Sequence, residues 1–187
     1  MFDLKSLRDK TLGQTGRLLL RPFLLSDSED FFEFLSHRET CYNDGGYQPY
    51  ADMGEDYFSL MEQFLEEEGR IVLEERTSKK VVGTIKLSPV LDRAVVALEI
   101  GYVTSPKARR KGFCFEALSH IIQNLFSKTE TRLLVIRAEI GNIPSQKLAE
   151  KLGFEREGII KKGFYHPEKG IVDMVSYVLE NPAFENL

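Results

Sequence analysis

The chain has 187 residues, of which 42% are hydrophobic and 29% are charged, proportions that are typical of a folded globular protein. They exclude a disordered or collagen-like chain. With 25 Lys and Arg against 29 Asp and Glu, the formal net charge of −4 argues against a protein that coats nucleic acid through bulk charge. We expect a single domain over residues 1–187, with its core between about residue 15 and about residue 181.

No run of eighteen apolar residues occurs, and the charged N-terminal segment lacks the apolar stretch of a signal peptide. We therefore expect a cytoplasmic protein that spans no membrane. The two cysteines, Cys41 and Cys114, form no CxxC pair, and the three histidines lack the spacing of metal ligands. The sequence thus predicts neither a structural disulfide nor a metal site, and it is compatible with a homodimer.

The first half of the chain predicts one strand, two helices and an antiparallel meander. A short apolar run ends at Pro22, and the period of the pattern changes from helical to extended after Gly69. In order, we expect a strand at 17–23, a helix capped by Ser26 or Asp27, a helix at 55–68, and strands at 70–76, 81–90 and 94–105. The polar segment between the two helices is expected to be a connection.

The second half predicts a strand, helix, strand unit. Apolar residues recur at helical spacing from Gly112 to Phe126, and residues 132–140 have the pattern of a buried strand. Because a helix joins two strands here, we expect parallel pairing through a right-handed crossover. A short helix stopped by Gly153 and a hairpin at 156–180 complete the chain. The fold class is therefore α+β, with a mixed, mostly antiparallel sheet of about six or seven strands, a central parallel pair and about four helices.

The sequence "ARRKGFC" stands where the crossover helix begins. The first backbone N–H groups of a helix have no partner inside it, and with the helix dipole they form an anion site. Gly112 lets the backbone approach a phosphate closely, and Arg109, Arg110 and Lys111 add positive charge. A diphosphate ligand is one interpretation of this turn. The other is a solvated charge run beside a loop glycine, which is the commoner origin of such a cluster.

Two blocks of sequence resemble the GCN5-related N-acetyltransferase (GNAT) superfamily. The segment "RRKGFC" matches the [Q/R]-x-x-G-x-[G/A] motif of that family, with Cys114 in place of the usual glycine or alanine. The second block, "NIPSQKLAEKLGFEREG", resembles its Asn-x-x-Ser segment followed by a helix and Gly-Phe. The "RLLLRP" and "EIGY" segments are similar to the branch that acetylates N-terminal alanines of ribosomal proteins.

The resemblance implies an acetyl-CoA site and assigns residues to it. The backbone of six consecutive residues would cradle the pyrophosphate: Arg109, Arg110, Lys111, Gly112, Phe113 and Cys114. Val103 and Thr104 would pair with the pantetheine arm like an added strand. Asn142 would hydrogen-bond pantetheine, and Ser145 would lie near the thiol.

Acetyl transfer to an amine needs a base and a proton for the departing thiolate. Glu99, on the strand that leads into the turn, is the candidate base, with an exposed or salt-bridged strand carboxylate as the alternative. Ser145 is the candidate acid, although a serine at this position can equally cap a helix. Tyr165 and Tyr177 could also act as acids, but aromatic residues in closing strands are more often core residues.

Cys114 offers another mechanism, because a thiol at a helix N-terminus can be reactive and could carry the acetyl group in a double displacement. We expect direct transfer in a ternary complex instead. The polar, aromatic segment 42–50 could form the wall of the acceptor site or only a connection. Nearby carboxylates could attract a cationic amine, or could be merely solvated: Glu33, Asp44, Asp52 and Glu55.

The expected function is therefore acetyl transfer from acetyl-CoA to a primary amine. The closest resemblance points to a protein N-terminal amine. Small-molecule amines, such as a polyamine, an aminoglycoside or an amino acid derivative, are the alternative acceptors. The alternative from another class of protein is an acyl-CoA-binding regulatory module without transferase activity. No nucleic acid and no membrane is expected as a partner.

Overall fold

The computed structural model describes residues 12–44 and 48–184. Its strands belong to one mixed sheet with the order β1-β2-β3-β4-β5-β6-β8-β7. The pair β5–β6 is parallel, and the pairs β1–β2, β2–β3, β3–β4, β6–β8 and β7–β8 are antiparallel. The described residues fall into two compact units, a first unit of residues 12–44, 48–86 and 102–117 and a second unit of residues 87–101 and 118–184.

The strands of the first unit follow the expected order. They are β1 (Gly13–Gln14), β2 (Leu18–Arg21), β3 (Arg70–Glu75) and β4 (Val81–Pro89), whose last residues lie in the second unit. The β3–β4 hairpin pairs Ile71 with Ile85, and both side chains are fully buried. The predicted hairpin is thus confirmed, and its apolar residues account for its stability in the core.

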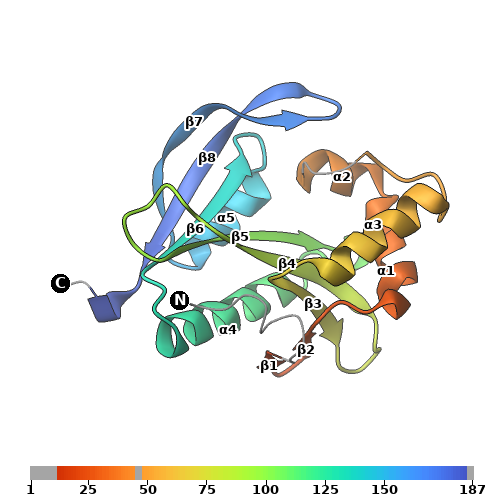
Figure 1. Cartoon of the computed structure of the whole chain (residues 1–187), viewed down its shortest axis with the longest axis horizontal. Helices are drawn as coiled ribbons and strands as arrows, with labels where there is room; N and C mark the ends of the chain where they lie inside the picture. Colours follow the sequence, from red (N-terminus) through yellow and green to blue (C-terminus); the bar gives the residue numbers. More distant parts are fainter. Residues whose placement is uncertain (1–11, 45–47, 185–187) are drawn as a thin grey trace. The chain divides into compact units, whose positions relative to one another are not determined.

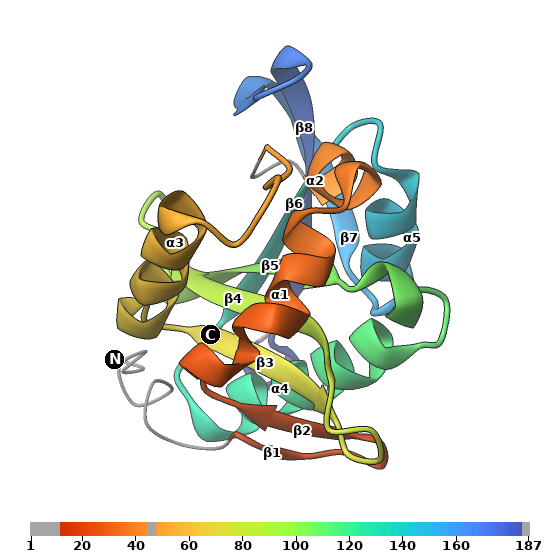
Figure 2. The same ribbon diagram turned by 90° about the vertical axis from the view of Figure 1, so that its right-hand side faces the viewer.

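The first unit contains three helices, α1 (Ser28–Leu35), α2 (Arg38–Asp44) and α3 (Glu55–Glu66), and α1 and α3 supply most of its main buried cluster. Helices α1 and α3 lie on one face of the β2–β4 strands (Figures 1 and 2). Phe31 of α1 packs edge to face against Phe23, which follows β2, with their ring centroids 4.9 Å apart. The buried cluster consists of Phe23, Phe31, Phe34, Leu35, Tyr57, Met61, Phe64, Val72 and Val81.

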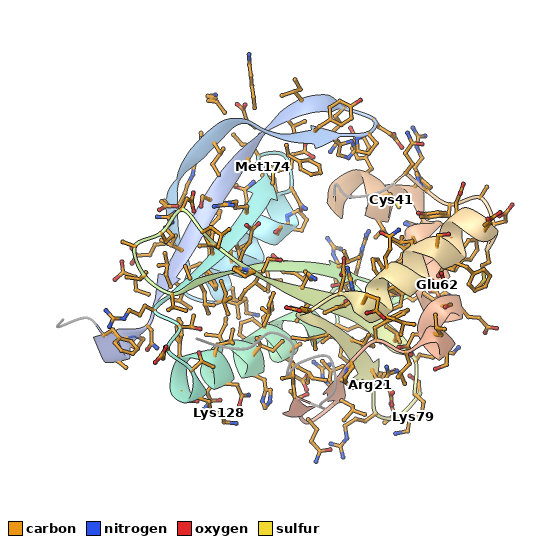
Figure 3. The ribbon with its side chains drawn as sticks, in the orientation of Figure 1. Arg21, Cys41, Glu62, Lys79, Lys128 and Met174 are labelled. Carbon is orange, nitrogen blue, oxygen red and sulfur yellow. The ribbon has the colours of Figure 1, made fainter. Side chains whose placement is uncertain are left out.

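Asp27, one of the two residues that the sequence offers as the cap of α1, occupies the N-cap position but makes no capping hydrogen bond to the helix. Its carboxylate instead accepts two hydrogen bonds from Arg21, at 2.8 and 2.7 Å, and one from the Leu24 N–H. Arg21, labelled in Figure 3, also donates to Glu74 at 2.7 Å. Asp27 pairs with Arg21 instead of capping the helix because a bidentate contact with a largely buried arginine is stronger than a single capping hydrogen bond.

The second unit contains the parallel crossover and the closing hairpin. Strand β5 (Ala97–Thr104) leads through α4 (Phe113–Lys128) to β6 (Leu133–Glu139), and the first residues of α4 and the last of β5 belong to the first unit. Helix α5 (Ile143–Lys151) then precedes β7 (Glu155–His166) and β8 (Gly170–Glu180), which form a long hairpin (Figure 1). The parallel pairing of β5 with β6 confirms the predicted crossover.

The structure differs from the expected element list in two short pieces. It has eight strands and five α-helices in the described residues, because β1 and α2 are additional. Strand β1 has only two residues, and α2 has the polar sequence "RETCYND" with few apolar positions to reveal a period. Over residues 12–44 and 48–184, no helix is both long and apolar enough to cross a membrane.

Candidate functional site

The turn between β5 and α4 has an unusual backbone. Strand β5 ends at Thr104, the Ser105 N–H donates to the Val82 carbonyl at 2.9 Å, and a 3-10 turn covers Pro106–Ala108. Arg110 then has a φ of 61° and Gly112 a φ of 79°. Residues in this left-handed region, next to ordinary ones, create concave arrangements of backbone N–H groups that bind anions. These residues lie directly before the N-terminus of a 16-residue helix, whose first N–H groups also attract anions.

Gly112 is required by its backbone angle and not by crowding. A Cβ atom built at this position would meet only Arg17 Nη2, at 3.5 Å, which is an ordinary contact. A φ of 79° is nevertheless a conformation that residues with a Cβ adopt only at a cost in free energy. Gly112 is also exposed, so that its backbone is accessible to a ligand.

Arg17 and Glu116 fasten the turn to the β1–β2 hairpin. Arg17 Nε donates to Glu116 Oε2 at 2.6 Å, and Arg17 Nη1 donates to the Lys111 carbonyl at 2.8 Å. The same guanidinium lies over the Phe113 ring, 4.5 Å from its centroid, within cation–π distance. Thr15 Oγ1 donates a further hydrogen bond to Glu116 Oε1. We call Thr15, Arg17 and Glu116 the turn clamp.

Within the turn clamp, Thr15 and Arg17 favour the ionised form of Glu116. Burial alone would raise the pKa of Glu116, but the hydrogen bonds from Thr15 and Arg17 and the positive charge of Arg17 hold it below its usual range. The carboxylate is therefore ionised throughout the neutral range. No sequence pattern assigns a role to Glu116 or to the Arg17 side chain, because the two are 99 residues apart. Their contact depends on the tertiary fold.

The three cations of the turn have different surroundings. Arg109 Nη2 donates to Thr40 Oγ1 on α2 at 2.8 Å, and Arg109 Nη1 lies 3.4 Å from Glu39 Oε1. Arg110 and Lys111 are exposed. The Arg109 side chain thus connects the turn to α2, whereas Arg110 and Lys111 are exposed to solvent. This arrangement agrees with a cradle made mainly by backbone atoms.

Strand β5 continues beyond its pairing with β6. The parallel register covers only Ala97 to Glu99, and the strand runs on to Thr104. At Val103 the β4 backbone approaches closely, since a Cβ on Gly83 would lie 2.6 Å from the Val103 carbonyl oxygen. Val103 and Thr104 are half-buried in the first unit. An extended segment of this kind is suited to pairing with a strand-like ligand.

Glu99 lies in the second unit, on β5 opposite Val135 of β6. Its Oε2 accepts a hydrogen bond from Arg137 Nη1 at 2.9 Å. Glu99 is therefore salt-bridged, as the alternative interpretation of this strand carboxylate expects. Burial raises the pKa of Glu99 above its ordinary value, Arg137 opposes the increase, and Asp92 adds to it. A carboxyl group with a raised pKa is better matched to a proton-accepting role at neutral pH than an ordinary one.

Asn142 and Ser145 also lie in the second unit, at the start of α5. Asn142 is the N-cap of this helix, and its Oδ1 accepts a hydrogen bond from the Ser145 N–H at 3.2 Å. Both side chains are half-buried. The asparagine of the second sequence block therefore shapes the helix start, which fixes the backbone around both residues.

The two tyrosines that were alternative acids have opposite environments. Tyr177 is 2% exposed, and its hydroxyl donates to Glu150 Oε1 on α5 at 3.0 Å. Burial and this hydrogen bond raise its pKa. Tyr177 thus belongs to the core, as expected for an aromatic residue in a closing strand. Tyr165 is 70% exposed, so it does not belong to the core.

The expected acceptor segment is only partly a connection. Tyr42 lies on α2 and is exposed, while Tyr50 packs against Tyr57 with ring centroids 5.4 Å apart. Residues 45–47 and the Asp44 side chain lie outside the described parts of the chain. Glu33 forms an ion pair with Lys107 at 3.0 Å.

Asp52 accepts a hydrogen bond from the Gly54 N–H at 2.9 Å, and Glu55 is an exposed residue at the start of α3. Cys114 is half-buried in the first turn of α4. Over the described ranges, no group of three or more His, Cys, Asp or Glu side chains is placed to hold a metal ion.

The comparisons with known proteins agree on one family. A family model described as an acetyltransferase (GNAT) domain matches residues 17–155. YoaA, an uncharacterised N-acetyltransferase of Bacillus subtilis, is 29% identical over 159 residues, which cover 81% of this chain and 87% of that protein. The family match includes the turn and the crossover helix.

Two solved structures are similar in fold. A ribosomal-protein-S5-alanine acetyltransferase from Vibrio fischeri has a TM-score of 0.73 and 18% identity, over 91% of this chain and 96% of that one. A spermidine N-acetyltransferase from Vibrio cholerae, in complex with CoA and spermine, has a TM-score of 0.72 and 17% identity, over 89% and 97% of the two chains. At such identities the likeness is one of fold.

Proposed function

Because this chain belongs to the GNAT family of N-acetyltransferases, we propose that it transfers the acetyl group of acetyl-CoA to the α-amine of a protein N-terminus. The observation that carries the proposal is the turn from Arg109 to Cys114. It combines two left-handed residues, Arg110 and Gly112, with the N-terminus of α4. This backbone fits the pyrophosphate of CoA.

The cofactor residues follow from the turn and from the sequence motif. The backbone of residues 109–114 would hold the pyrophosphate, with Arg110 and Lys111 adding charge. Val103 and Thr104 would pair with pantetheine along the extended end of β5. Asn142 would contribute a hydrogen bond to pantetheine in addition to capping α5.

In the proposed reaction, acetyl-CoA supplies the acetyl thioester. The amine nitrogen forms a bond to the acetyl carbon, the carbon–sulfur bond breaks, and the amine loses a proton to Glu99 directly or through water. The departing thiolate takes a proton from the Ser145 hydroxyl, which solvent then restores. An α-amine with a pKa of about 8 is partly neutral at physiological pH, whereas a lysine amine with a pKa of about 10.4 is almost fully protonated. A single moderately strong base is therefore sufficient for an N-terminal substrate.

A small-molecule amine is the second candidate acceptor. The fold resembles the spermidine acetyltransferase about as closely as the ribosomal-protein enzyme, with TM-scores of 0.72 and 0.73. The fold therefore does not discriminate between the acceptors. The sequence segments "RLLLRP" and "EIGY", which resemble the protein N-terminal branch, favour the first.

The experiment is a thiol-release assay with acetyl-CoA and a panel of amines. The panel contains a peptide that begins with alanine, the same peptide with a blocked N-terminus and an internal lysine, and spermidine. We expect turnover with the free alanine peptide and little with the blocked one. Preferred turnover of spermidine would replace the proposed acceptor, and CoA binding without turnover of any amine would indicate a binding module.

Glu99→Gln tests the assigned base. The variant removes the proton acceptor but keeps the size of the side chain, so we expect kcat to fall by about 100-fold or more while the Kd of acetyl-CoA stays nearly constant. An unchanged kcat would show that Glu99 is not the base.

A further inference from the structure

Glu99 and Arg137 form an ion pair between the two parallel strands of the second unit. Glu99 of β5 is in register with Val135 of β6, and Arg137 follows Val135 by two residues on the same side of the strand. Arg137 Nη1 donates to Glu99 Oε2 at 2.9 Å. The side chains are 27% exposed for Arg137 and 31% exposed for Glu99, so the pair is largely removed from water.

We propose that Arg137 is a positioning residue, which keeps the Glu99 carboxylate ionised and oriented to accept a proton from the acceptor amine. The inference rests on the proposed role of Glu99 as the base. The contact occupies Oε2, and Oε1 accepts no hydrogen bond from any residue that the structure describes. Oε1 is therefore the oxygen that is left for the amine proton or for a bridging water.

The charge of Arg137 is needed because Glu99 is half-buried. Burial raises the pKa of Glu99, and Asp92 raises it further, so without Arg137 the carboxyl group would keep its proton up to a higher pH. A protonated carboxyl group cannot accept the proton of the amine. Within residues 12–44 and 48–184, Arg137 is the only cation that acts against this increase. Asp92 is 74% exposed and lies 3.9 Å from Arg137 Nη2, so its effect is weaker.

A neighbouring carboxylate shows that the dependence is specific to Glu99. Glu157 is held by Arg93, with Arg93 Nη1 2.6 Å from its Oε1, and accepts a hydrogen bond from Ser176 Oγ at 2.9 Å. The hydrogen bond from Arg93 is the main cause of its lowered pKa, and Arg137 contributes least. Removal of Arg137 thus leaves Glu157 with its partners, whereas Glu99 loses its only hydrogen-bond donor among the described residues.

Arg93 provides a matched control for this reason. It is the same residue type in the same unit, its side chain is 28% exposed, and it pairs with a carboxylate other than Glu99. The experiment compares wild type, R137Q, R137K and R93Q in the full-length chain. The first measurement is an NMR titration of ¹³C-labelled glutamate carboxyl groups, with the Glu99 signal assigned through its absence in E99Q.

We expect the titration midpoint of Glu99 to move to higher pH in R137Q, to stay close to wild type in R137K, and to be unchanged in R93Q. D92N should move it in the opposite direction, because a negative charge is removed. This measurement needs no acceptor, so it tests Arg137 even if the acceptor is assigned wrongly. A Glu99 midpoint that is the same in R137Q and wild type would overturn the inference.

The second measurement is the pH profile of kcat/KM with the alanine peptide, or with spermidine if that amine is turned over faster. On the acid side, R137Q should be about 3- to 10-fold slower than wild type and should recover toward the alkaline plateau. R93Q should keep the wild-type profile. A uniform loss at all pH values in R137Q would indicate a structural role only. Full activity of E99Q would contradict the proposed base itself, whatever the behaviour of Arg137.

Discussion

Gly112 shows how one backbone angle can decide which residue a turn accepts. Its φ of 79° is strained for any residue with a Cβ, although space is available for the atom itself. The sequence motif indicated that a glycine was needed here. It could not indicate whether the reason was lack of space or backbone geometry, because that distinction depends on the atoms around the turn.

Gly112→Ala should therefore weaken both the fold and the turn. We expect the free energy of unfolding in urea to fall by about 1–2 kcal/mol, the cost of a left-handed conformation for a residue with a Cβ. If the same cost falls on the cofactor-bound turn, the Kd of acetyl-CoA, measured by calorimetry, should rise by about 5- to 30-fold. Gly158→Ala is the control, because a Cβ added at Gly158 would have no atom within 4 Å and the residue has no left-handed φ. Equal effects of the two variants would contradict the explanation.

Glu116 should make the stability of the protein depend on acid pH. Because its pKa in the folded state is lowered from the ordinary 4.5, the ionised carboxylate stabilises the fold above that pH. This stabilisation is lost as the pH falls through 4.5 toward the lower folded-state value. Glu116→Gln should reduce the free energy of unfolding at pH 7 by about 1–2 kcal/mol, through the loss of charged hydrogen bonds to Thr15 and Arg17.

Urea titrations of the variant between pH 7 and pH 3.5 provide the measurement. The difference between wild type and Glu116→Gln should shrink at the acid end of this range, because protonation removes the charge that distinguishes the two side chains. Glu62→Gln, at an exposed position on α3, should show no such convergence. A difference that stays constant down to pH 3.5 would mean that the ionised carboxylate is not the source of the stability.

At the scale of elements, the long pieces of the fold were predictable and the short ones were not. The meander, the crossover helix and the closing hairpin have apolar periods that extend over many residues, as in Leu118, Ile121 and Leu125 of α4. Helix α2 has seven residues and a polar sequence. Cys41 is the one buried apolar residue among its described side chains, and one residue cannot define a helical period. The helix is held by tertiary contacts, including that of Thr40 with Arg109.

Arg109→Ala should consequently loosen α2. Loss of the charged hydrogen bond to Thr40 and of the Glu39 contact removes about 1 kcal/mol of local stability, which corresponds to roughly 5-fold faster amide exchange. Hydrogen–deuterium exchange with mass spectrometry should show this change over residues 38–44 and not over α3. The neighbouring variant Arg110→Ala should leave both helices unchanged, and an α2 that exchanges at the wild-type rate in Arg109→Ala would rule out this anchoring.

For the whole molecule, the family could be predicted from two sequence blocks because its motif is local. The contacts that support the site are not local, since Arg17 with Glu116 and Glu99 with Arg137 are each joined only by folding. No spacing rule in the sequence pairs such residues.

Binding of CoA should stabilise the entire chain. A ligand at 100 times its Kd adds about 2.7 kcal/mol to the free energy of unfolding if it binds only the folded state. Thermal denaturation should therefore show a higher Tm with CoA. Pantetheine at the same concentration is the control, and its effect should be smaller because it lacks the diphosphate that the turn is expected to hold. An equal shift from both compounds would place the main binding contacts elsewhere.

Strand β7 has a consequence for behaviour in concentrated solution. It is the last strand in the sheet order. An outermost strand has unpaired backbone N–H and C=O groups, with which a strand of another molecule can pair. Its register shifts between Ile160 and Phe164, Lys162 has a φ of 53°, and Asp173 binds both Lys161 and the Lys162 N–H. The irregular, charged stretch interrupts the edge after Ile159 and Ile160, which are exposed. We expect this irregular stretch to disfavour edge-to-edge pairing along β7.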